Sequence, residues 1–237
     1  KVARHLVENR GVEELVLTSR QGEASSEAGP VREVLEALGA RVQIVACDVS
    51  SQASVASCLT SMRQGSGIRG IVHAAGLIED ATLTKMSLEK LSRVLEPKMS
   101  GAWNLHQASE ADDLDFFVLF SSIAGVMGSP GQSNYAAANA FMDALARHRI
   151  KSGLKATSIA WGPWADGGMA AELAAADQAR MQRRGFSPLE GAQGLELFDE
   201  ALDEPDSLVV AVNLDVRRIQ KLIERSATPV PPLYRNL

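Results

Sequence analysis

The sequence predicts an α/β fold in which a doubly wound parallel sheet is covered by helices on both faces. Short apolar runs of strand length, such as 114–122, alternate along the chain with longer segments of helical spacing. These runs are apolar throughout, as expected of strands that are buried on both sides. Because a helix follows each strand, the chain returns to the same end of the sheet before the next strand begins.

The composition is that of a globular protein and excludes several classes of function. The 237 residues are 46% hydrophobic, and 24 Lys and Arg stand against 29 Asp and Glu, a net charge of −5. This balance argues against a surface for nucleic acids or anionic membranes. No apolar run approaches the roughly 20 residues that cross a bilayer. Cys47 and Cys58 lack partners at zinc spacing, so we expect no metal site and a reducing, cytoplasmic location.

The first third of the chain predicts three helices and three strands in alternation. Gly11 is placed to end the first helix, and Pro30 can occupy the first position of the second. Gly39 is placed to end that helix, and Ser51 can cap a third that runs to about residue 64. The predicted strands cover 14–19, 41–49 and 69–76.

The rest of the chain continues this alternation. A helical stretch over 87–109 is interrupted at Pro97, and a second helix is predicted over 132–151. The sequence SPLE at 187–190 resembles a capping box at the start of a helix, and Asp215 can cap a last short helix. Further strands are predicted over 114–122, 155–162 and 207–214.

The strand ends indicate where the functional site should be sought. In open parallel sheets, ligands bind beyond the carboxyl ends of the strands. Polar, small, Gly and Pro residues gather at those ends, which predicts a catalytic cleft. They are Ser19-Arg20, Asp48-Val49, His73 to Gly76, Ser121-Ser122 and Trp161 to Trp164.

The segment at 120–145, FSSIAGVMGSPGQSNYAAANAFMDAL, is the part of the chain that indicates its chemistry most specifically. Tyr135 and Asn139 are four residues apart and therefore share a helix face. Ser122, at a strand end 13 positions before Tyr135, can meet the Tyr hydroxyl if the loop folds back. That geometry suits protonation of a carbonyl oxygen. Taken alone, Tyr135 would be better read as a half-buried helix residue.

Together with LVLTSRQG, CDV, HAAG, PKMSGAWNLH and WGPWADGGM, this segment resembles the short-chain dehydrogenase/reductase superfamily. Typical members have a Lys four residues after the Tyr, where this chain has Asn139; a lysine occurs instead at Lys98. This exchange resembles the ketoreductase domains of modular type I polyketide synthases. The resemblance covers essentially the whole chain and implies a Rossmann-like fold.

The resemblance implies a role for each of the four residues in reducing a ketone with hydride from a nicotinamide. Tyr135 would donate a proton to the developing alkoxide, and Lys98 would stabilise the phenolate that results. Ser122 would bind the carbonyl oxygen through a hydrogen bond. Asn139 would hold Lys98 or a water in the proton path.

Cofactor residues are also implied at the strand ends. Ser19-Arg20 stands where an acidic residue would bind the ribose of NAD, so NADPH is expected. His73 is expected to be a packed strand residue, and Met169 with the Ala-rich helix after it would form a movable lid. Asp48 and Val49 would flank the adenine, and Pro163 would contact the nicotinamide. Ala74, Ala75 and Gly76 are small enough to let the protein backbone approach the cofactor closely.

The resemblance further implies a β-ketoacyl thioester substrate on the phosphopantetheine arm of an acyl carrier protein, with other synthase domains in the same polypeptide. One class of these domains has Leu-Asp-Asp where this chain has Ile78-Glu79-Asp80, and another has Trp where this chain has Met127. This favours the first class and a D-configured hydroxyl, although 78–80 could be an ordinary solvated acidic loop. Trp164 and Met169 are expected on the substrate side.

In the family, a first strand and a glycine-rich phosphate loop precede the position of Lys1, so both are expected to be missing from the given chain. The sheet would then have a gap. We expect an N-terminally truncated catalytic domain at 1–225 of a longer polypeptide, with a linker or docking tail at 226–237. Two alternatives stay open: a non-catalytic structural domain of a synthase, and a free-standing dehydrogenase of small alcohols or sugars.

Overall fold

The computed structural model describes residues 1–65, 67–165, 181–183 and 185–225. Met169 and the predicted tail at 226–237 lie outside the described residues.

The core of the fold is a parallel sheet of four strands in the order β3-β4-β5-β7. Two further strands, β1 and β2, pair in parallel as a separate sheet, with Glu14 opposite Arg41. The expected gap is therefore present between β1 and β3, whose edges do not pair with each other. The parallel strands are β1 (Glu14–Ser19), β2 (Arg41–Ala46), β3 (Gly70–His73), β4 (Phe116–Ser122), β5 (Thr157–Trp161) and β7 (Leu208–Ala211).

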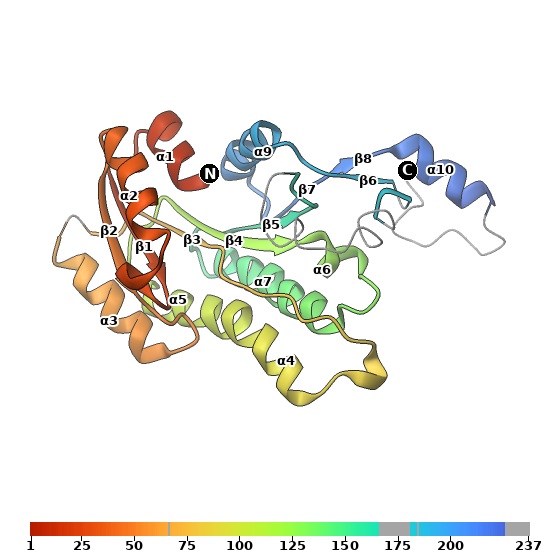
Figure 1. Cartoon of the computed structure of the whole chain (residues 1–237), viewed down its shortest axis with the longest axis horizontal. Coiled ribbons are helices and arrows are strands. Elements are labelled where there is room, and N and C mark those ends of the chain that lie inside the picture. Colours follow the sequence, from red (N-terminus) through yellow and green to blue (C-terminus); the bar gives the residue numbers. More distant parts are fainter. Residues whose placement is uncertain (66, 166–180, 184, 226–237) are drawn as a thin grey trace.

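Helices cover both faces of the four-stranded sheet, which confirms the predicted fold class (Figure 1). Phe117 and Leu119 of β4 pack with α5 and α7, whereas Val118, between them, packs with α1 and α9. The described helices are α1 (Val2–Arg10), α2 (Ala28–Ala37), α3 (Gln52–Arg63), α4 (Leu88–Leu95), α5 (Gly101–Ala108), α6 (Ile123–Met127), α7 (Ser133–Lys151), α9 (Gly191–Asp203) and α10 (Val216–Arg225). Shorter turns are η1 (Gly22–Ala24), η2 (Leu83–Lys85) and the π-helical turn η3 (Glu96–Ser100).

Local sequence signals account for several helix ends. Gly11 adopts φ 65° after α1, a left-handed conformation that is cheap for glycine. The Ser51 side chain accepts a hydrogen bond from the Ser54 amide at the start of α3, and Asp215 Oδ1 accepts one from the Arg218 amide at the start of α10. Each cap satisfies an amide that has no partner within its helix.

Several predicted boundaries are wrong. The strands predicted over 41–49 and 69–76 end at Ala46 and His73, three residues earlier than expected. Pro30 is the third residue of α2, not the first. Residues 187–190 do not form a capping box: the Leu189 amide donates to Pro163 O, and α9 begins only after Glu190. The predicted strand 207–214 is divided into β7 and β8 (Asn213–Leu214), and β8 pairs antiparallel with β6 (Phe186–Ser187). In the last two cases a hydrogen-bond partner distant in the sequence determines the conformation of the backbone.

Candidate functional site

The centre of the site is formed where β4 ends and α7 begins. Ser122 is the last residue of β4, and its hydroxyl caps α6 by accepting from the Ala124 amide at 3.2 Å. Tyr135 lies in the first turn of α7 and is 7% exposed. Burial raises the pKa of Tyr135, while hydrogen bonds with Ser122 and Asn139 act in the opposite direction. The loop between β4 and α7 thus brings Ser122 and Tyr135 together.

Lys98 reaches this centre from a different element. It lies on η3, between α4 and α5, and is only 1% exposed. Its Nζ donates to Phe120 O at 2.9 Å and lies 5.2 Å from the centroid of the Tyr135 ring. Burial lowers the pKa of Lys98 to about 8. A cation in this position lowers the energy of a Tyr135 phenolate through a low-dielectric medium.

Asn139 completes the group, one helical turn after Tyr135. Its Nδ2 donates to Tyr135 O at 2.7 Å. Its buried Oδ1 has no hydrogen-bond partner among the described residues. A buried acceptor of this kind can hold a water or an ammonium group, which fits the role that the sequence predicts for Asn139.

His73, at the end of β3, is 3% exposed. Burial, and then the charge of Lys98, lowers its pKa to about 4, so the imidazole is neutral at pH 7. Its Nε2 has no hydrogen-bond partner among the described residues. These features match a packed strand residue.

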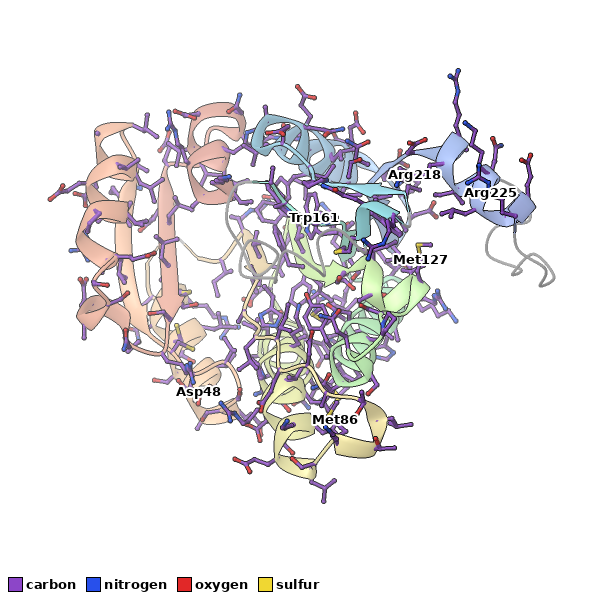
Figure 2. All side chains as sticks on the ribbon, turned by 45° about the vertical axis from the view of Figure 1, so that its right-hand side comes forward. Asp48, Met86, Met127, Trp161, Arg218 and Arg225 are labelled. Carbon is purple, nitrogen blue, oxygen red and sulfur yellow. The ribbon has the colours of Figure 1, made fainter. Side chains whose placement is uncertain are left out.

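The predicted cofactor residues lie at the carboxyl ends of four strands, β1 and β2 of one sheet and β3 and β5 of the other. Ser19 is the last residue of β1 and Arg20 follows it, and both are exposed. The Ser19 hydroxyl accepts a hydrogen bond from the Gly22 amide. Asp48 follows β2 and accepts from the Ser50 amide through Oδ1. Figure 2 shows Asp48 at the end of the β1–β2 sheet, well separated from Met127 on α6. The expected cofactor contacts therefore span both sheets.

The residues present fit a nicotinamide cofactor. Ala74 and Gly76 are exposed after the end of β3, the edge at which dinucleotides bind to this class of sheet. Their small side chains leave the backbone open to close approach. Asn104, on α5, fixes the neighbouring segment by donating to Val49 O at 2.9 Å.

The segment Ile78 to Asp80 is tied to the start of α7. Gln132 Nε2 donates to both Asp80 carboxylate oxygens, at 3.2 and 3.1 Å, and Asn134 Nδ2 donates to Glu79 O at 2.9 Å. Sequence reasoning missed Gln132 and Asn134, because neither periodicity nor charge singles out two amides that lie more than 50 positions from their partners. Met127, at the end of α6, is half-buried.

Pro163 and Trp164 follow β5 and contact the chain before α9. Pro163 O accepts from the Leu189 amide at 2.7 Å, and the Trp164 ring lies 5.0 Å from the Trp161 ring. Gly194 of α9 fits against Trp164, since a Cβ there would lie 2.5 Å from Trp164 Cη2. The end of β5 is thus held by α9.

Within residues 1–65, 67–165, 181–183 and 185–225, no helix has the length and apolar character needed to span a bilayer. Within the same ranges, no three His, Cys, Asp or Glu side chains are grouped as metal ligands would be.

Comparisons with known proteins give the family. Residues 1–166 match the family model described as KR domain. The phenolphthiocerol synthesis polyketide synthase type I Pks15/1 of Mycobacterium bovis is 46% identical over 230 residues, which cover 96% of this chain and 11% of that protein. Pks1 of Mycobacterium tuberculosis, whose name describes it as inactive, is 46% identical over 230 residues, 96% of this chain and 14% of that protein.

Solved structures agree. A structure described as "Structure of A-type Ketoreductases from Modular Polyketide Synthase" has a TM-score of 0.90 at 37% identity, covering 99% of this chain and 48% of that chain. The chain therefore spans about half of that structure and a small part of the curated synthases. KR domains reduce keto groups with nicotinamide cofactors. This chain belongs to the KR family: it is a ketoreductase domain of the type I polyketide synthase kind, in the short-chain dehydrogenase/reductase superfamily.

Proposed function

We propose that this chain reduces a β-ketoacyl thioester to a β-hydroxyacyl thioester with NADPH. The observation that supports this most is the position of the buried Lys98 Nζ, 5.2 Å from the centroid of the Tyr135 ring. A phenol beside a buried cation is a better proton donor than a phenol alone, because the phenolate that it leaves is stabilised.

In the proposed reaction, NADPH supplies the hydride that reduces the carbonyl carbon. Tyr135 gives its hydroxyl proton to the developing alkoxide oxygen. The Ser122 hydroxyl donates a hydrogen bond to the same oxygen and stabilises its charge. Lys98 stabilises the Tyr135 phenolate until a proton returns, and Asn139 holds Lys98 or a water along that route.

The preference for NADPH over NADH rests on Arg20. Its guanidinium is exposed at the end of β1, and Ser19 beside it carries no charge that would repel a 2′-phosphate. Asp48 and Val49 would flank the adenine. Pro163 would contact the nicotinamide.

We further propose that the substrate is carried by the phosphopantetheine arm of an acyl carrier protein, and that other synthase domains share the polypeptide. Support comes from the relatives, which are large multidomain synthases. On this view 1–225 is the catalytic domain and 226–237 is a linker or docking tail. The free thiols of Cys47 and Cys58 suit the reducing cytoplasm.

For product stereochemistry we propose a D-configured hydroxyl. The acidic segment Ile78 to Asp80 is held beside Tyr135 through Gln132 and Asn134, so it could guide the substrate toward one face of the cofactor. Met127 and Trp164 are proposed to line the substrate side. Met169, outside the described residues, keeps its proposed place in a lid.

The decisive experiment uses the full natural polypeptide that carries this chain. NADPH consumption is followed with a β-ketoacyl N-acetylcysteamine thioester, and product chirality is determined in the same assay. Tyr135→Phe keeps the ring beneath Lys98 but removes the proton, so we expect turnover to fall by about 10²-fold or more while NADPH binding is retained.

The second candidate is a folded, non-catalytic ketoreductase domain. It is favoured by the name of the Mycobacterium tuberculosis relative, which describes that protein as inactive. Absence of turnover in a folded wild-type chain that binds NADPH would establish it. Equal turnover by the wild type and Tyr135→Phe would overturn the proposed role of Tyr135.

A further inference from the structure

Asp143 is a buried carboxylate that the proposed reaction does not use. It lies on α7, four residues after Asn139 and eight after Tyr135, so all three share one helix face. The residue is only 8% exposed. Its Oδ1 accepts from the Ser158 hydroxyl of β5 at 2.6 Å, and the Ser121 hydroxyl of β4 lies on the same side of α7, 3.4 Å from Asn139 O.

These contacts favour the ionised form of Asp143. Burial raises the pKa of the Asp143 carboxyl group overall, and hydrogen bonds from Ser121 and Ser158, with the charges of Lys98 and Arg147, limit that rise. Serine hydroxyls that donate to a buried carboxyl oxygen stabilise negative charge more than they stabilise the neutral acid.

Lys98 is the buried cation of the same centre: its Nζ donates to Phe120 O, and the hydroxyl of the next residue, Ser121, donates to Asn139 O on α7, one turn before Asp143. Phe120 O is a neutral acceptor and does not balance the charge of the Lys98 ammonium group. A buried ammonium without a nearby negative charge loses its proton, because desolvation penalises the charged form. Asp143 is the group whose charge raises the pKa of Lys98 against that penalty.

We propose that Asp143 is a positioning residue that keeps Lys98 protonated beside Tyr135. It touches neither the expected substrate nor the expected cofactor, and it acts through Lys98. This inference rests on the proposed function. It also explains why a carboxylate lies one turn after Asn139. Because the lysine of this chain lies on η3 and not on α7, its buried positive charge needs a negatively charged partner on α7, the helix of Tyr135.

Other charged and titratable groups surround this centre. His73 of β3 faces Lys98 and is neutral at pH 7, because burial lowers its pKa to about 4. Tyr135 of α7 lies beneath Lys98, and the charge of Asp80, before η2, acts to raise the pKa of Tyr135. Arg147, one turn after Asp143, is exposed. Of the two carboxyl groups, Asp80 and Asp143, it is Asp143 whose charge raises the pKa of Lys98.

The test is the pH dependence of kcat/KM for the reduction in the full natural polypeptide. In the wild type, activity should fall at alkaline pH as Lys98 loses its proton. Asp143→Asn keeps the shape and the acceptor for Ser158 but removes the charge, so the pKa of Lys98 falls. The alkaline limb, which is the part of the pH profile where activity falls as the pH rises, therefore moves to lower pH by about one unit. At about pH 7.5 this gives roughly a threefold loss of activity.

Three variants serve as controls. Ser158→Ala removes the hydrogen bond but keeps the charge, and Asp113→Asn removes an exposed carboxylate; neither should move the alkaline limb. Asp143→Glu keeps the charge and changes the shape, so its limb should stay within a few tenths of a unit of wild type. Because Asp143→Glu makes its own prediction, it tests the proposal even if Asp143→Asn does not fold.

The outcomes separate the two proposals. A limb that moves in Asp143→Asn but not in Asp143→Glu supports the role of Asp143. Wild-type turnover with a limb that Asp143→Asn leaves in place, or an equal loss at every pH, overturns this inference alone. A limb displaced by half a unit or more in Asp143→Glu also overturns it. No turnover by the folded wild type overturns the proposed function, and the role of Asp143 with it.

Discussion

Gly76 lies directly against the Lys98 side chain: a Cβ atom on Gly76 would come within 2.7 Å of Lys98 Cε and 3.3 Å of Lys98 Cγ. Real Cβ atoms do not approach other atoms so closely, so any other residue at position 76 must displace the lysine. The absence of a side chain there is thus part of how Lys98 is placed beside Tyr135.

We therefore expect Gly76→Ala to lower kcat by about tenfold to 100-fold, since a shift of about 1 Å in a positioned group has effects of this size. NADPH consumption by the full natural polypeptide provides the measurement. Gly29→Ala is the matched control, because a Cβ at Gly29 would meet nothing within 4 Å. Unchanged kcat in Gly76→Ala would show that Lys98 tolerates the displacement.

Arg20→Ala should weaken the binding of NADPH and leave that of NADH nearly unchanged. A charge-assisted hydrogen bond to a phosphate contributes about 1.5 to 3 kcal/mol, which corresponds to at least a tenfold rise in KM for NADPH. Arg218→Ala is the control, since this exposed arginine lies on α10, far from Asp48 in Figure 2. An equal rise in KM for both cofactors would exclude recognition of the 2′-phosphate by Arg20.

The buried His73 should make stability depend on pH. Its pKa is about 4 in the folded chain and about 6.5 when unfolded, so the unfolded state binds more protons between these values. Above about pH 6.5, His73 therefore does not lower the free energy of unfolding. Below that pH it lowers the free energy of unfolding increasingly, by about 2 kcal/mol at pH 5. Urea unfolding measured at about pH 6.5 and at about pH 5 should show this fall in the free energy of unfolding.

In His73→Gln the free energy of unfolding should depend less on pH over the same interval. His148→Gln, which removes an exposed histidine, is the matched control and should keep the wild-type slope. If both variants keep that slope, His73 does not control the acid sensitivity of the fold.

Arg149 should contribute to stability through its buried contacts between α5 and α7. Its Nη1 lies 3.0 Å from His106 Nδ1, its Nε donates to Lys155 O at 3.2 Å, and its Cζ lies 3.9 Å from the Phe117 ring centroid. Burial lowers the pKa of Arg149 to about 10, so it stays charged at neutral pH. Arg149→Ala should cost about 3 to 5 kcal/mol, from lost packing and from polar atoms left without partners.

Arg149→Met, which fills most of the space, should cost less than Arg149→Ala, and the exposed Arg147→Ala less than about 0.5 kcal/mol. Denaturant unfolding of the three variants gives the comparison. Equal losses for the Ala and Met variants would assign the whole effect to the polar contacts.

The regular part of the fold could be predicted from the sequence because its signals are local. The strand at 14–19 has the predicted bounds, and the helix after Ser51 has the predicted cap. The helical stretch broken at Pro97 is also present, although its break is a π-helical turn and not an end. A proline in a helical sequence predicts that the helix is irregular at that point, but it does not predict whether the helix ends, kinks or forms a π-turn.

The errors lie where tertiary contacts outweigh local propensity. Residues 187–190 have the letters of a capping box, but the Leu189 amide finds its partner at Pro163, 26 positions earlier. The division of 207–214 follows from the pairing of β8 with β6. For the candidate site, motif spacing indicated Tyr135 and its neighbours, whereas the contacts of Asp143 with β5 depend on the packing of α7 on the sheet.

The π-helical turn that carries Lys98 has a consequence for how this centre tolerates changes in length. A π-turn accommodates one residue more than an α-helix over the same rise, and each residue of a helix turns the chain by about 100°. Deleting one residue from 96–100 would restore a regular helix from α4 through α5 and rotate one of them by about that angle. If the deleted residue is not Lys98, the lysine would then turn away from Tyr135 although both residues are still present. The placement of Lys98 beside Tyr135 thus depends on a single inserted position as much as on the identity of any residue.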